Sequence, residues 1–218
     1  LNQEIFMKKL LNISSIVILI FSLSSIAKAD YLKLNYGLTS NDNAVKLNGT
    51  GATIDDDDEG FMISAGTKLY GNFGLEVMYY DLGETSIKGS VGDKIKVDNA
   101  GYVFTTAGTV KNETTGYGLG IFAESETTTG LGTFSGFLKL GMHNWDRSGA
   151  TTLIEEASKS FASRFYNDGI DMYFGIGINA GITENIALNI SYDSMGFADD
   201  GSLDNAGSLT SIGITANF

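Results

Sequence analysis

The chain has 218 residues, a length typical of one domain, with 28 glycines, no proline and no cysteine. Without cysteine it forms neither disulfide bonds nor a thiolate metal site, and an apolar content of 43% excludes disorder over the whole length. The net charge of -12 opposes a nucleic-acid partner, because phosphate binding needs a surface rich in lysine and arginine.

The start of the chain has the three parts of a secretory signal. Lys8 and Lys9 follow Met7, an apolar run covers 10–26, and the Ala-Lys-Ala sequence at 27–29 has the pattern of a cleavage site. The run is shorter than the roughly 20 apolar residues that a spanning helix needs. We therefore predict cleavage after residue 29 rather than a membrane anchor.

This signal divides the chain into three parts. We interpret residues 1–6 as upstream translated sequence, residues 7–29 as a signal peptide, and residues 30–218 as the exported domain. No second apolar stretch in the exported part is long enough for a spanning helix. The exported domain is therefore either soluble or crosses its membrane as strands.

Eight segments of the exported part alternate apolar and polar residues with a period of two, the pattern of strands with one apolar face. In one of them Phe73, Leu75 and Val77 alternate with Gly74 and Glu76. A two-residue connection joins this segment to the preceding one, which indicates a hairpin. The eight predicted strands cover 31–39, 61–70, 73–81, 117–124, 134–145, 170–180, 186–194 and 208–218.

The two faces of these strands differ in chemistry. One face is apolar, whereas the other is rich in glycine and carries charged side chains. A soluble sandwich would turn its polar face to water, where glycine has no packing advantage. A narrow eight-stranded barrel explains the glycines, because small residues must alternate with large ones in its filled interior. The charged residues that we predict to face the lumen are Lys33, Lys68, Glu76, Glu124, Lys139, Asp171 and Asp193.

The connections between the predicted strands are long and short in turn. Long loops on one rim and short turns on the other are typical of bacterial outer-membrane barrels, whose termini both lie on the periplasmic, short-turn side. We predict an all-β fold, an eight-stranded antiparallel up-and-down transmembrane β-barrel in the outer membrane. A secreted soluble sandwich is the alternative.

Several segments resemble the OmpA-like family of eight-stranded outer-membrane proteins. Residues 75–83 are similar to the family's third strand, with Glu76 at its inward acidic position, and residues 137–146 to its fifth, with Lys139 at its inward basic position. The resemblance implies a closed barrel, and insertion by the barrel-assembly machinery, which would read the C-terminal aromatic residue Phe218.

The sequence also departs from this family. It has no counterpart of the periplasmic peptidoglycan-binding domain of the best-known members, so wall anchoring is not expected. Ser191 stands where the seventh strand often has an inward acid, and Ala216 replaces an aromatic residue near the end. Ser191 puts one of the family's interior ion pairs in question, and Ala216 puts in question how strongly the barrel-assembly machinery recognises the last strand.

Two groups of residues could carry chemistry. His143, the only histidine, could form an acid–base pair with Asp146 or Ser148 near the outer rim, but we favour a structural role in a filled lumen. An acidic run could bind calcium or magnesium and bridge to lipopolysaccharide phosphates, although such runs usually form solvated loops. The run consists of Asp55, Asp56, Asp57, Asp58 and Glu59. We expect no cofactor and no resident metal.

The lumen charges lead to the functional hypotheses. Charges in a narrow interior must pair, because one left without a partner costs several kcal/mol, and paired charges plug the barrel. Our main hypothesis is a non-enzymatic protein that stabilises the outer membrane and presents acidic loops outward. Its partners would be membrane lipids, lipopolysaccharide and unidentified surface ligands. The alternatives are a small or gated ion pore that opens when the charges re-pair, and an enzyme that acts on lipid A through His143.

Overall fold

The computed structural model describes residues 29–41, 45–47, 51–97, 100–130, 132–155, 161–197 and 206–218. The predicted signal peptide and the six residues before it lie outside this part, apart from residue 29. Among the described residues, no helix has the length and hydropathy needed to span a bilayer. The strands are β1 (Tyr31–Asn41), β2 (Val45–Leu47), β3 (Thr53–Asp55), β4 (Asp57–Tyr70), β5 (Phe73–Gly89), β6 (Lys94–Val97), β7 (Ala100–Phe104), β8 (Gly108–Thr129), β9 (Gly132–Glu155), β10 (Phe161–Gly181), β11 (Ile186–Gly196) and β12 (Ala206–Asn217).

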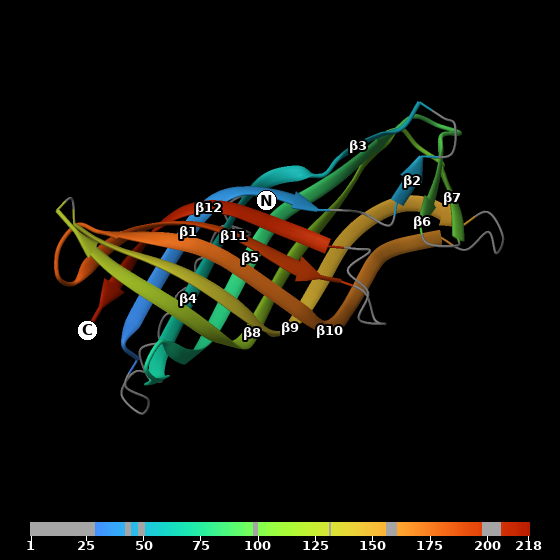
Figure 1. Ribbon diagram of the computed structural model, residues 1–218. Coiled ribbons are helices and arrows are strands. Elements are labelled where there is room, and N and C mark those ends of the chain that lie inside the picture. Colours follow the sequence, from blue (N-terminus) through green and yellow to red (C-terminus); the bar gives the residue numbers. More distant parts are fainter. Residues whose placement is uncertain are drawn as a thin grey trace.

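Eight of these strands form a closed antiparallel barrel (Figure 1). In the order β1, β4, β5, β8, β9, β10, β11 and β12, each strand pairs with the next. The ring closes because β12 also pairs with β1, with Asn217 opposite Tyr31. The predicted fold class is therefore confirmed, and closure leaves no sheet edge in the barrel wall.

All eight predicted strands occur, but several are much longer than predicted. The segments 82–116 and 146–169 were predicted to be connections, whereas much of each continues the barrel strands. In β8, for example, residues 108–116 precede the segment that the sequence marked as a strand. Beyond the membrane a strand can be polar on both faces, so the period-two pattern on which the prediction rested disappears there.

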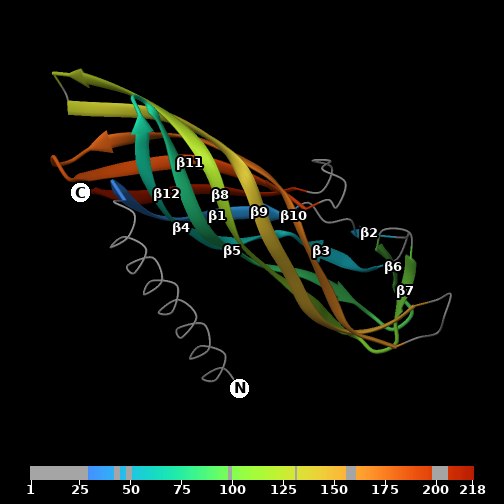
Figure 2. The same cartoon turned by 90° about the horizontal axis from the view of Figure 1, so that it is seen from below.

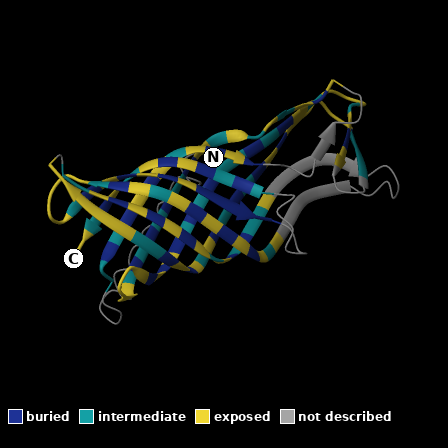
Figure 3. Ribbon diagram, in the orientation of Figure 1, coloured by how far each residue is buried: buried dark blue, intermediate teal, exposed yellow. Residues whose placement is uncertain are grey.

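Burial alternates along the barrel strands, as the banding in Figure 3 shows. The outward apolar side chains are about half exposed, for example 54% for Leu34, 47% for Leu140 and 54% for Ile190. A continuous apolar belt of this kind is unusual on a soluble protein. A hydrocarbon environment covers it at no cost, and antiparallel pairing within the barrel satisfies the backbone groups that lipid cannot.

The two ends of the barrel differ. At one end, here named the short-turn end, neighbouring strands are joined by tight turns, and the backbone N–H of Phe218 donates to the carbonyl oxygen of Asp30 at 2.9 Å. The turn after β4 places Gly71 at a φ of 55°, a left-handed conformation that glycine adopts without strain. At the other end the long strands continue beyond β1, β11 and β12 (Figures 1 and 2).

The extension at this second end is here named the outer arm and consists of β2, β3, β6, β7 and the adjoining ends of β5, β8, β9 and β10. It has its own cluster of buried apolar side chains, with Ile54 and Tyr102 packed beside it. The cluster consists of Ala52, Ile87, Ile95, Phe104 and Val110. Segments that the sequence predicted as connections are therefore strands of a folded β-structure (Figure 2). The apolar cluster forms its small core.

The outward face gives a test of lipid contact. Ile176 lies near the middle of the spanning part of β10 and is 51% exposed. We expect Ile176→Arg to lower the free energy of unfolding by about 2–4 kcal/mol in lipid vesicles, because arginine is costly at the bilayer midplane. The measurement is urea unfolding followed by tryptophan fluorescence.

The matched control is Thr109→Arg, on the part of β8 that belongs to the outer arm. Its cost should stay below about 1 kcal/mol, the range for positions outside the hydrocarbon core. Equal costs for the two substitutions would contradict the assignment of the outward face to lipid.

Candidate functional site

Three charged side chains meet near the middle of the lumen. The ammonium of Lys139 on β9 lies 3.2 Å from Oε1 of Glu76 on β5 and 2.8 Å from Oδ1 of Asp193 on β11. Each of the three side chains is at most 1% exposed. One cation thus joins two carboxylates from different parts of the barrel wall, and these residues are here named the lumen triad.

A glycine makes this arrangement possible. Gly175 on β10 is the register partner of both Lys139 and Asp193, so the ion pair must cross over it. A Cβ atom at Gly175 would lie 2.3 Å from Oδ1 of Asp193 and 2.4 Å from Cε of Lys139. The inward glycines that the sequence showed are therefore needed where a charged side chain from one strand reaches across its neighbour.

Hydroxyl groups complete the bonding of both carboxylates. Tyr31 donates to Oε2 of Glu76 at 2.7 Å, and Ser64 donates to the same oxygen at 3.1 Å. Ser191 donates to Oδ2 of Asp193 at 2.9 Å. The sequence put one interior ion pair in question because Ser191 replaces an acid, but Asp193, two residues later, supplies the carboxylate.

The other four charged residues lie elsewhere in the lumen. Lys68 pairs with Glu124 at 3.0 Å near the short-turn end, where both are partly exposed. The ammonium of Lys33 lies over the ring of Phe137, 3.8 Å from its centroid. Asp171 is buried in the outer half, and its Oδ1 accepts the backbone N–H of the next residue at 2.7 Å. The structure thus joins three of the seven residues in one network and two in a separate pair.

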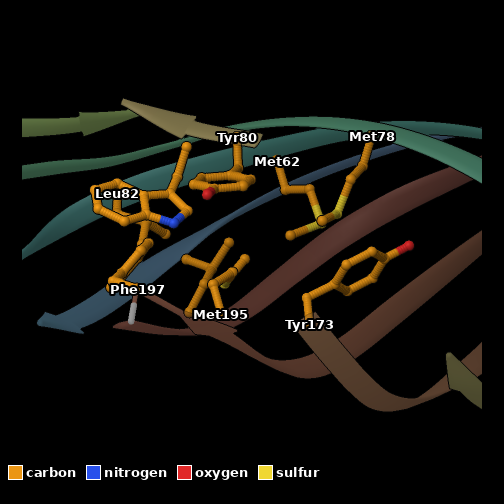
Figure 4. Close-up of a cluster of buried hydrophobic side chains, with 9 residues drawn as sticks. Met62, Met78, Tyr80, Leu82, Tyr173, Met195 and Phe197 are labelled. Carbon is orange, nitrogen blue, oxygen red and sulfur yellow. The ribbon is translucent and has the colours of Figure 1, made fainter. Parts of the chain in front are cut away.

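An apolar cluster fills the outer half of the lumen (Figure 4). The sequence predicted a polar inward face, and here the interior is instead closed by aromatic, methionine and leucine side chains. Met62, Met78, Tyr80 and Tyr173 fall on the inward face of the predicted strands, and Trp145 and Leu209 share that parity, whereas Leu82, Met195 and Phe197 come from predicted connections. This cluster, here named the apolar plug, consists of Met62, Met78, Tyr80, Leu82, Trp145, Tyr173, Met195, Phe197 and Leu209.

His143 packs against this plug. Its Nδ1 lies 2.6 Å from the hydroxyl of Tyr80, and its ring lies edge-on to those of Tyr173 and Phe197. Asp146 is an odd number of residues away on β9 and therefore projects from the opposite face of the strand, as does Ser148. The structure does not bring together the acid–base pair considered from the sequence.

The acidic run covers the end of β3 and the start of β4, and strand geometry turns its side chains in different directions. Asp57 and Glu59 are exposed, and Glu59 accepts a hydrogen bond from Tyr36, whereas Asp58 turns aside to accept the backbone N–H of Glu84 at 2.6 Å. Within the described part of the chain, no group of three or more histidine, cysteine or acidic side chains is placed to hold a metal ion. The run does not form one cation cage.

A cavity of about 490 Å³ opens at the short-turn end of the lumen and is here named the vestibule. Its wall combines charged, aromatic and small side chains from most strands of the barrel. Among the residues that line it are Asp30, Tyr31, Lys33, Lys68, Glu76, Phe122, Glu124, Glu126, Phe137, Asn179, Glu184 and Thr215. Along the barrel the structure therefore has an open vestibule, a charged layer and an apolar plug.

Comparison with known proteins agrees with this architecture. The family model described as the OmpA-like transmembrane domain matches residues 27–218. No curated protein sequence matches the chain significantly.

Several solved structures are similar to this chain at low sequence identity. The attachment invasion locus protein Ail of Yersinia pestis is 12% identical, with 87% of this chain and 99% of that chain covered and a TM-score of 0.46. The N-terminal β-barrel domain of Pseudomonas aeruginosa OprF is 12% identical, with 87% and 98% covered and a TM-score of 0.49. Neisserial surface protein A is 15% identical, with 86% and 96% covered and a TM-score of 0.46.

The lumen triad gives a stability test. We expect Lys139→Met to lower the free energy of unfolding by about 3–5 kcal/mol at neutral pH, because it leaves two buried carboxylates without their cation. Adding Asp193→Asn to that variant should recover part of the loss, since it removes one of the two uncompensated charges. Urea unfolding of the refolded barrel in vesicles measures both values.

The matched control is an exposed ion pair on the outer arm. Lys111 lies 2.6 Å from Glu84, whose hydrogen bond and charge raise the pKa of the lysine ammonium. Lys111→Met should cost less than about 1 kcal/mol, as is usual for exposed pairs. If Lys139→Met were as mild as this control, the lumen triad would not be a determinant of stability.

Proposed function

Because this chain belongs to the OmpA-like transmembrane domain family, we propose that it works as a sealed, non-enzymatic barrel that stabilises the outer membrane and presents its outer arm at the cell surface. The single observation that supports this proposal best is the double closure of the lumen. The lumen triad crosses the bore, and the apolar plug fills the space beyond it. Such an interior suits a scaffold better than a passage.

The outer arm is the surface that the barrel would present. In barrels of this architecture short turns lie in the periplasm and long connections lie outside. By this rule the short-turn end faces the periplasm and the outer arm projects from the cell. The arm's own apolar cluster holds a defined shape there, and the exposed carboxylates of Asp55, Asp57 and Glu59 lie at its base.

Partners follow from the same orientation. The half-exposed apolar belt would contact membrane lipids, and the exposed acids at the outer rim would lie near lipopolysaccharide, where divalent cations could bridge carboxylates to phosphates. Phe218 follows β12 and is 78% exposed, so its ring would be accessible to the barrel-assembly machinery during insertion.

One observation favours a small gated pore as a second candidate. Lys139 contacts two carboxylates at once, so it could release Glu76 and remain paired with Asp193. Such re-pairing would open a path through the charged layer. The apolar plug opposes this candidate, because ions would still have to cross a bore filled by rings and thioethers.

Conductance in planar bilayers separates the two candidates. For the refolded wild-type protein we expect no discrete openings, because the plug stays in place whichever carboxylate Lys139 contacts. Lys139→Ala should also remain closed. Openings in the wild type whose frequency changes in Lys139→Ala would instead establish the pore and overturn the sealed barrel.

Cysteine labelling tests the orientation, and the chain has no cysteine of its own. Lys96→Cys places a thiol at an exposed position of the outer arm, and Asn72→Cys places one in an exposed turn at the short-turn end. In intact cells a membrane-impermeant maleimide should label the first and leave the second unmodified. Permeabilising the outer membrane should make Asn72→Cys reactive, and the reverse pattern would invert the proposed orientation.

A further inference from the structure

The vestibule contains a buried cation that the fold does not pair. Lys33 is 6% exposed and lines the cavity. Its ammonium lies 3.8 Å from the ring centroid of Phe137 and 5.2 Å from that of Tyr31. Among the residues that the structure describes, no hydrogen-bond acceptor or carboxylate contacts this ammonium. Aromatic faces attract a cation but supply less than a carboxylate would.

Glu76 of the lumen triad does not serve as the partner of Lys33. Glu76 also lines the vestibule, but its two oxygens already receive Lys139, Tyr31 and Ser64. Because Lys33 lines the open cavity, its ammonium can be reached from the vestibule. Lys33 therefore provides a recognition point for an anionic group that enters the cavity from outside the fold.

The rim of the vestibule has the opposite charge. Four carboxylates lie around the opening, and Lys68 is the cation among them, paired with Glu124. Glu126 and Glu184 are exposed there, whereas Asp30 accepts the backbone N–H of Lys68 at 2.6 Å. A simple anion would be repelled at this rim before it reached Lys33. A molecule with one negative and one positive end would be attracted at both.

From this pairing of charges we propose that the vestibule binds a small zwitterion, an amino acid or short peptide. Its carboxylate contacts the ammonium of Lys33, and its ammonium group faces the rim carboxylates of Glu126 and Glu184. The rings of Tyr31 and Phe122 pack against the molecule between the two ends. The cavity volume of about 490 Å³ falls within the roughly 300–1,000 Å³ of small-molecule sites. This inference is independent of the proposed surface role.

Triglycine and its two blocked forms are suitable probes. Calorimetry on the refolded full chain in nanodiscs should show saturable binding of triglycine. Binding should be lost with triglycinamide, which has no carboxylate for Lys33, and weakened with N-acetyl-triglycine, which has no ammonium for the rim. Acetate and inorganic phosphate, which carry only negative charge, should not bind detectably.

Substitution of Lys33 gives the second part of the experiment. Lys33→Met keeps the length and apolar stem of the side chain, and it should weaken triglycine binding by at least about tenfold, the loss expected for one charge-assisted contact. Lys111→Met, on the outer arm, should bind as the wild type does. A heat-modifiable gel shift shows whether each variant is a closed barrel.

The outcomes decide the proposal. It would be overturned by wild-type protein that binds none of the three peptides, by Lys33→Met that binds triglycine unchanged, or by equal binding of triglycine and triglycinamide. Acetate or phosphate binding as tightly as triglycine would identify a plain anion site and overturn the zwitterion. If Lys33→Met does not fold, the comparison of the three peptides on wild-type protein still gives the answer.

Discussion

The structure depends on one constraint, the narrow bore of an eight-stranded barrel, in which a charge that is closed off from water must find its partner among the side chains of the wall. Lys139 meets this constraint by joining Glu76 and Asp193, and hydroxyl groups bond the remaining carboxylate oxygens. The glycine at position 175 follows from the same constraint, since the ion pair occupies the space that a side chain would fill. Composition, hydrogen bonding and charge placement in the lumen thus have one physical origin.

This constraint also orders the interior along its axis. The charged layer lies between two regions of different character, a cavity that is open to solvent and a plug without formal charge. Lys33 marks the boundary on the open side, where the fold leaves a cation without a carboxylate. On the other side Met62 marks the boundary, because its sulfur lies 3.4 Å from the ammonium of Lys139.

The sequence predicted those features that lipid imposes and missed those that lipid does not reach. In the spanning strands one face must be apolar and the other small or polar, so alternation placed β1, β11 and β12 to within two residues and assigned Lys139 to the interior. In the outer arm this requirement is absent, and residues such as Ile87 and Phe104 are separated by polar residues without a recognisable period. The sequence therefore predicted the segments of the outer arm as connections between strands.

The candidate site was predictable in its members but not in its pairing. The period-two alternation of the strands indicates that Glu76, Lys139 and Asp193 face the lumen. Which of these side chains meet depends on the strand register and on the length of the side chains, and a single sequence shows neither. The plug was missed for a related reason. Leu82, Met195 and Phe197 come from segments that were expected to be connections, and only the closure of the barrel brings them together.

The separate core of the outer arm has an evolutionary consequence. Ile87, Phe104 and Val110 form the core of the arm. Exposed positions of the arm, such as Lys88 and Lys96, therefore do not contribute to the packing of the barrel. Mutations there can change the surface of the arm while the barrel keeps its fold. The protein thus separates the part that must stay constant from the part that can diversify.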